Sequence, residues 1–241
     1  MWRLILISLL FAGCMGGTYN DMIIVAPAKN ELYSVATIQK ITDSTTPVHI
    51  YIEGDGHSFD SHGHATDDPT PHSRFMRRMA LADNSPNVAY IARPCQFVMD
   101  DKCNVSDWTD GRFSKPIVDS VAYAIKTIAG TRPVILIGYS GGAMISGLVI
   151  QNHNEIDVKK WITIAGVLNH TDWTRYFNDS PLTHSLNLNT LPRLPQTHYI
   201  VEKDSVIPNI LSKQWVNLND IKIIKNAKHN TILVIKLDFT Y

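Results

Sequence analysis

Serine, acidic and histidine side chains occur along this chain in an order that suits acyl-transfer chemistry. The run Gly138-Tyr139-Ser140-Gly141-Gly142 fits the pattern Gly-x-Ser-x-Gly, in which glycines permit a tight turn and leave the serine hydroxyl projecting. A serine hydroxyl is a poor nucleophile near neutral pH, so it needs an imidazole to accept its proton. Ser140 is therefore the candidate nucleophile.

Order along the chain selects the base and the acid from several candidates. His229 follows a late strand-like run, and it is the only histidine downstream of Asp204, which follows the strand-like run before that one. We therefore expect His229 to accept the proton of Ser140 and Asp204 to fix the imidazole tautomer. Glu202 and Asp172 are weaker alternatives for the acid.

A tetrahedral intermediate also needs two N–H donors for its oxyanion. The residue after the nucleophile, Gly141, should supply one backbone N–H. The turn Glu53-Gly54-Asp55-Gly56 should supply the other, and we favour the N–H of Asp55, with Gly54 as the alternative. The same turn is also compatible with a simple tight connection.

A loop-like segment carries many potential metal ligands. Histidine and aspartate suit zinc and harder ions, but this segment is rich in Ser, Thr and Pro and has no His-x-x-x-His helix pattern. We therefore interpret it as a solvated loop and expect no metal and no cofactor. The residues concerned are His57, Asp60, His62, His64, Asp67, Asp68 and His72.

Strand-like and helix-like runs alternate and must position these residues. Apolar or β-branched runs at 48–52, 88–92, 133–137, 160–165, 198–201 and 221–224 read as strands, and 74–82, 115–128 and 141–151 read as helices. This alternation predicts an α/β fold with a mostly parallel, doubly wound sheet and ligands outside the carboxyl ends of its strands. Residues 168–196, aromatic and without clean periodicity, should form a small cap. Residues 31–41 suggest an edge strand.

The N-terminus has the features of an export signal. A basic start and a short apolar run cover residues 1–13, and small residues precede Cys14. We expect a lipoprotein-type signal peptide over 1–13, lipidation of Cys14, and one domain over 14–241. Ordinary signal-peptidase cleavage and a buried first strand are the alternatives.

Cysteine count and charge bound the remaining possibilities. Of three cysteines, lipidation of Cys14 leaves Cys95 and Cys103, which could close a small loop in an oxidising compartment or remain reduced. Lys+Arg and Asp+Glu both number 22, without a basic stripe, so nucleic acid is not an expected partner.

Several of these pieces together resemble the α/β-hydrolase superfamily, in particular exported or lipoprotein-like bacterial members of unassigned function. The matching residues are 52–56, 68–71, 92–96, Cys103, Trp108, 112–114 and 138–142. The resemblance implies the α/β-hydrolase fold and the Ser140, Asp204 and His229 triad. It also strengthens a Cys95–Cys103 bridge and weakens the metal hypothesis. Residues 231–241 depart from it, being short and strand-like where the fold usually has a terminal helix.

The sequence thus predicts a serine hydrolase, similar to carboxylesterases, thioesterases and lipases, that acts on a small-molecule acyl substrate; a peptidase is also open. A lipid anchor would attach it to a membrane of the bacterial cell envelope, with Met15 compatible with outer-membrane sorting; otherwise it would be periplasmic. The alternatives are a catalytically silent binding protein of the same fold and a metal-dependent hydrolase using the 57–72 segment.

Overall fold

The computed structural model describes residues 22–28 and 31–241, and one eight-stranded sheet organises them. The spatial order is β1-β2-β4-β3-β5-β6-β7-β8. Strands β1 and β2 pair antiparallel, as do β2 and β4, and every other pair is parallel. The predicted mostly parallel α/β sheet is confirmed. The predicted signal peptide and the predicted lipidation site Cys14 lie outside the described residues.

The elements follow the predicted alternation closely in the centre of the chain. The strands are β1 Ile23–Val25, β2 Val35–Ile41, β3 Val48–Ile52, β4 Asn87–Ile91, β5 Val134–Tyr139, β6 Val158–Ile164, β7 Gln196–Val201 and β8 Ile221–Ile224. The α-helices are α1 Phe75–Leu81, α2 Lys115–Ala129, α3 Gly141–Asn152, α4 His170–Phe177 and α5 Asn209–Lys213. Short 3-10 turns cover Val105–Trp108, Leu218–Asp220 and His229–Thr231.

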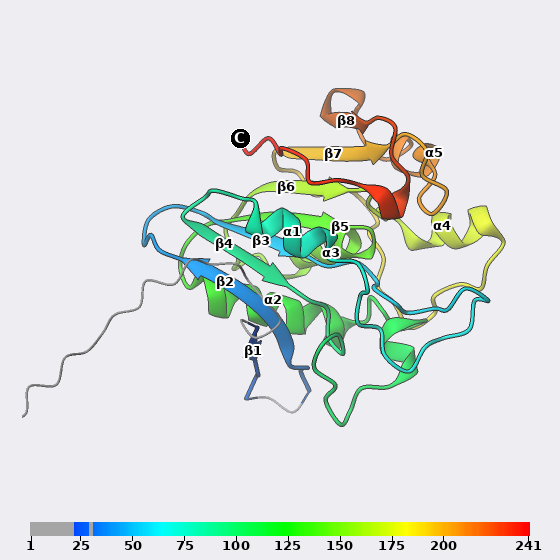
Figure 1. The fold of residues 1–241 in the computed structure, drawn as a ribbon, viewed down its shortest axis with the longest axis horizontal. Helices are drawn as coiled ribbons and strands as arrows, with labels where there is room; N and C mark the ends of the chain where they lie inside the picture. The colour runs from blue at the N-terminus through cyan, green and yellow to red at the C-terminus, as the bar shows by residue number, and fades with distance from the viewer. Residues whose placement is uncertain (1–21, 29–30) are drawn as a thin grey trace, which may run out of the picture.

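The sheet separates two apolar cores, and alternating side chains of the central strands enter each. Ile50 of β3 packs toward α2 and α3, whereas Tyr51 packs toward α1. All five residues of β3 are buried, as expected for a parallel strand covered on both faces. In Figure 1, α1 and the C-terminal segment lie on one side of the sheet and α2 and α3 on the other.

The ends of the chain differ from the sequence predictions. Residues 31–41 are predicted to form an edge strand. Residues 35–41 instead form β2, which is internal because it pairs with β1 on one side and β4 on the other. Residues 232–241 form neither strand nor helix. Ile232 and Leu237 are nevertheless buried in the core on the α1 side, so this segment covers sheet surface as an extended chain.

Two further predictions concern loops. Cys95 and Cys103 form a disulfide with Cα atoms 5.9 Å apart, which confirms the predicted pair. The 168–196 segment contains α4 and, apart from Gln196 at the start of β7, has no other regular element within the described residues; its role as a cap stays a prediction. No helix within 22–28 and 31–241 combines the length and the hydropathy of a membrane span.

Candidate active site

Ser140 lies on the sharp turn between β5 and α3. Its φ of 51° is positive, a strained backbone conformation for a residue with a side chain. The neighbouring glycines allow this turn: a Cβ at Gly138 would lie 2.4 Å from the Gly142 carbonyl, and one at Gly142 would lie 2.5 Å from the Glu53 carbonyl. Only glycine therefore lets the turn approach the end of β3 so closely.

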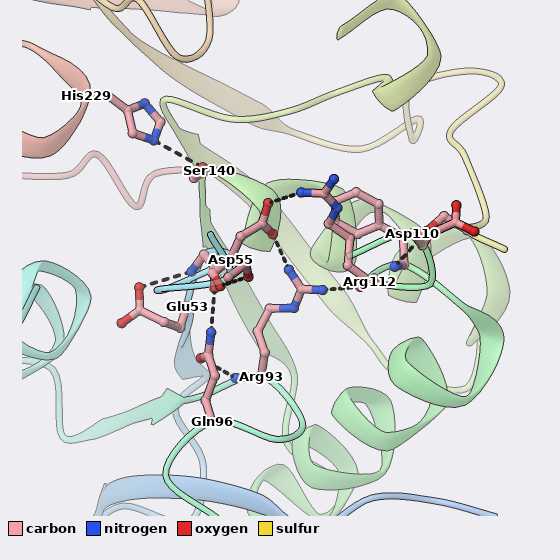
Figure 2. A network of polar contacts seen from close by, with 12 residues as sticks. Glu53, Asp55, Arg93, Gln96, Asp110, Arg112, Ser140 and His229 are labelled. Carbon is pink, nitrogen blue, oxygen red and sulfur yellow. Dashed lines mark hydrogen bonds and ion pairs between the residues drawn. The ribbon is translucent and has the colours of Figure 1, made fainter. Parts of the chain in front are cut away.

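The structure brings the three predicted triad residues together. His229 Nε2 lies 3.1 Å from Ser140 Oγ, and His229 Nδ1 lies 2.8 Å from Asp204 Oδ2. Figure 2 shows the imidazole of His229 facing Ser140. The Asp204 side chain is 1 % exposed and that of His229 is 7 % exposed. This arrangement can pass a proton from the hydroxyl to an imidazole whose other nitrogen is held by a carboxylate.

Backbone groups hold this arrangement in place. The N–H groups of Val206 and Ile207 donate to Asp204 Oδ1 at 2.9 and 2.8 Å, which leaves Oδ2 for the imidazole. The Tyr139 hydroxyl donates to the His229 carbonyl at 3.1 Å, and the two rings stack 5.2 Å apart. The loop after β7 thus orients Asp204, and the last residue of β5 holds His229.

The alternative acids are engaged elsewhere. Glu202 accepts a hydrogen bond from the Asn226 N–H at 3.0 Å. Asp172 accepts hydrogen bonds from Trp215 Nε1 and Gln214 Nε2, each at 2.9 Å. Asp204 is the carboxylate that contacts His229.

The two predicted oxyanion residues lie against each other at the ends of β3 and β5. A Cβ at Gly141 would fall 1.9 Å from Asp55 Oδ1, so the Asp55 carboxylate rests on the Cα of Gly141. Gly141 is the first residue of α3, and N–H groups at a helix start have no acceptor within the helix. That the Gly141 and Asp55 N–H groups bind an oxyanion stays a prediction.

An ionic cluster around Asp55 was missed by the sequence analysis. Asp55 Oδ1 accepts from Arg93 Nη1, and Asp55 Oδ2 accepts from Arg112 Nη1 at 3.2 Å. Arg93 Nη2 also donates to the Arg112 carbonyl, and Figure 2 shows Asp55 between the two guanidinium groups. Burial alone would raise the pKa of Asp55, but the charges of Arg112 and Arg93 outweigh it and lower the pKa.

Gln96 fixes the same turn from below. Its Nε2 donates to the Gly54 carbonyl at 3.0 Å, and its Oε1 accepts from the Arg93 N–H at 3.0 Å. Arg93 and Gln96 flank the disulfide residue Cys95. The cross-linked loop thereby supports the turn that contains Asp55.

Glu53, at the start of that turn, gives a pH prediction. It is 4 % exposed, and burial raises its pKa from 4.5 to about 7 despite hydrogen bonds from Gly54 and Tyr90 and the charge of Arg77. Protonated Glu53 therefore contributes stability that is fully present below the unfolded-state pKa. This contribution is lost as pH rises through the folded-state pKa, because the buried carboxyl group must then ionise. From acidic to alkaline pH, the free energy of unfolding of Glu53→Gln should therefore rise by roughly 3 kcal/mol relative to that of wild type.

Urea denaturation of both proteins at low and high pH measures this difference. Glu155→Gln is the control of opposite sign, because hydrogen bonds from its own N–H and from Lys126 lower the pKa of that carboxylate. A Glu53→Gln effect that is independent of pH would contradict the prediction.

The histidine-rich segment shows stacking and local pairing. His57 and His72 stack with ring centroids 4.1 Å apart, and His64 Nδ1 lies 3.3 Å from Asp60 Oδ2 on the surface. Among the described residues, no group of three or more His, Cys, Asp or Glu side chains is arranged to hold a metal ion.

The chain has the α/β-hydrolase fold, as its mostly parallel sheet and its similarity to solved structures of that fold show. An α/β serine hydrolase homologue from Coxiella burnetii is similar over 89 % of this chain and 91 % of that one, with a TM-score of 0.55 and 16 % identity. The mouse α/β hydrolase domain-containing protein 10 is similar over 86 % and 90 %, with a TM-score of 0.57 and 15 % identity.

A third structure, of epoxide hydrolases that belong to the α/β-hydrolase superfamily, from metagenomes of hot environments, has a TM-score of 0.54 and 11 % identity over 86 % of this chain and 92 % of that one. No family model and no curated protein matches the sequence. At these identities the comparisons establish the fold, and the activity must be argued from the site.

Proposed function

We propose that this protein is a serine hydrolase that cleaves an ester or related acyl bond through an acyl-enzyme. The observation that carries the proposal is the continuous contact from Ser140 Oγ through His229 to the buried carboxylate of Asp204. A serine at a strained strand-to-helix turn, with an imidazole in hydrogen-bond reach, has the arrangement of an activated nucleophile.

The proposed reaction has two halves. Ser140 Oγ attacks the acyl carbon while His229 Nε2 takes its proton, and the imidazolium then protonates the leaving alkoxide as the ester C–O bond breaks. Water, deprotonated by His229, next attacks the acyl-enzyme and releases the acid and free Ser140. In both halves the Gly141 and Asp55 N–H groups are proposed to stabilise the oxyanion.

The space beside Ser140 favours small acyl groups. A cavity of about 40 Å³ adjoins the serine, and apolar side chains including Phe113, Val167 and Ile207 line much of it. A cavity of this size is well below the usual range for small-molecule sites, so it accommodates only a small group. Cleavage of carboxylesters with small acyl groups is therefore the primary proposal, ahead of long-chain lipid substrates.

Labelling with a fluorophosphonate probe tests the proposal. Wild type should form a covalent adduct, and Ser140→Ala should form none, because the probe reacts with an activated serine hydroxyl. Intact-mass spectrometry measures the adduct, and circular dichroism confirms that both proteins are folded. A folded wild type that never reacts would instead favour a catalytically silent binding protein of the same fold.

The location proposed for this activity rests on residues 1–14 alone. The apolar run and Cys14 support a lipid anchor that holds the domain in the bacterial cell envelope. Mass spectrometry of the mature N-terminus distinguishes a diacylated Cys14 from ordinary signal-peptidase cleavage.

A further inference from the structure

The pocket beside Ser140 is lined by three polar side chains that the proposed reaction does not use, and one of them, the Asp55 carboxylate, is already paired with Arg93 and Arg112. Its lining includes Arg112 and His170 among mostly apolar groups. Pockets of this composition bind the hydrocarbon part of a ligand with their walls and fix its orientation with the few polar groups. The question is therefore which ligand group would satisfy Arg112 and His170.

Arg112 is a buried cation with unused hydrogen-bond donors. Its residue is 7 % exposed; Nη1 donates to Asp55 at 3.2 Å, while Nε has no partner within the described part of the chain. The guanidinium lies over the rings of Phe59 and Trp173, at 5.6 and 6.0 Å from their centroids. Packing between these rings holds the cation in place beside the pocket.

The charge around Arg112 is not balanced within the cluster. Asp55 contributes one negative charge and contacts two guanidinium groups, those of Arg93 and Arg112, so the cluster has a formal charge of +1. The nearby carboxylate of Asp110 is paired with the imidazole of His184. A buried net charge is costly unless a counter-ion or a ligand charge compensates it.

His170 adds a second unsatisfied group on the same pocket. It is 5 % exposed, and neither of its ring nitrogens reaches hydrogen-bond geometry with any described residue. Its ring stacks on Phe113 at 5.9 Å. Burial lowers the pKa of His170, and the Arg112 charge lowers it further, against the opposing effect of the Ser185 and Leu186 carbonyls. A neutral imidazole keeps one N–H donor for a ligand.

We infer that Arg112 and His170 form a carboxylate-binding subsite beside Ser140, so that the preferred substrates are half-esters of short dicarboxylic acids. This inference rests on the proposed ester hydrolysis for its substrate class but not for binding itself. A guanidinium with free N–H groups suits a planar carboxylate, and the apolar walls suit a short methylene chain. The size of the pocket excludes long chains.

Binding of free glutarate tests the subsite without any catalysis. Calorimetric titration of wild type should show binding, and Arg112→Met should weaken it by about 10- to 100-fold, as expected for loss of a charge-assisted hydrogen bond. His170→Leu should weaken it by roughly 3- to 30-fold, and this variant keeps the test valid if Arg112→Met does not fold. Arg175→Met, at an exposed arginine of α4, is the matched control and should bind like wild type.

Hydrolysis of a matched ester pair then tests the substrate class. In methyl 5-methylhexanoate an isopropyl group replaces the carboxylate of monomethyl glutarate, and proton release measures cleavage of both. Wild type should prefer the acidic ester by about 10-fold or more in kcat/KM, and Arg112→Met should lose this preference.

Each outcome separates the two proposals. Equal cleavage of both esters, or glutarate binding that is unchanged in folded Arg112→Met and His170→Leu, would overturn the carboxylate subsite and leave the hydrolase intact. Glutarate binding that depends on Arg112, without cleavage of either ester, would support the subsite and count against the hydrolase.

Discussion

Ser140→Ala should lower kcat for p-nitrophenyl butyrate by about four to six orders of magnitude, and His229→Ala should have a similar effect. Without the hydroxyl no acyl-enzyme forms, and without the imidazole, 3.1 Å from Oγ, the hydroxyl keeps its proton. Because the two residues act as a unit, the double variant should be no slower than the worse single variant. Steady-state release of p-nitrophenolate measures all four proteins.

A matched histidine controls for general effects of the substitution. His153 Nε2 lies 3.0 Å from Asp119, so it also pairs with a carboxylate, but it follows α3 at the end remote from Ser140. His153→Ala should change kcat by less than about twofold. Activity of Ser140→Ala within tenfold of wild type, after correction for contaminating esterases, would show that the predicted triad does not catalyse the reaction.

The turn around Ser140 was predictable because its determinants are local. The apolar run 133–137, the glycines at 138, 141 and 142 and the following small-residue helix are contiguous in sequence, and the structure places β5, the turn and α3 there. The meeting of Ser140, Asp204 and His229 was also predictable, since the carboxyl ends of parallel strands lie at one edge of a sheet.

The ionic cluster and the carboxylate subsite could not be predicted in the same way. Asp55 pairs with residues 38 and 57 positions away, and no periodicity encodes which side chains meet across loops. Arg93 and Arg112 stood out only as parts of the resemblance to a family, without a role. His170 had no signal beyond its position in an aromatic segment.

The ends of the sheet were mispredicted for a related reason. The alternation in 35–41 indicates a strand but not its neighbours, and the pairing of three-residue β1 with β2 decides that β2 is internal. The β-branched residues of 232–241 indicate a strand. Ile232 and Leu237 instead bury their side chains over the α1 side, so tertiary packing overrides local propensity there.

Asp55→Ala should reduce the free energy of unfolding by about 3 to 5 kcal/mol, the range for removing one partner of a buried ionic group. The guanidinium side chains that it contacts are only 5 % and 9 % exposed, so both charges would remain in a poorly solvated site. Urea denaturation measures the loss. Asp157→Ala removes a carboxylate paired with Lys159 on the surface and should cost less than about 1 kcal/mol.

A double-mutant cycle shows whether the loss comes from uncompensated charge. Removing one cation relieves the imbalance that Asp55→Ala creates, so the Asp55→Ala/Arg112→Met variant should be less destabilised than the two single effects added together. Strict additivity would instead assign the cost of Asp55→Ala to lost packing against Gly141. If charge dominates, a dicarboxylate in the pocket should restore part of the stability that Asp55→Ala loses, because the ligand supplies the missing negative charge beside Arg112. The same ligand should not stabilise the Asp55→Ala/Arg112→Met variant, which lacks Arg112.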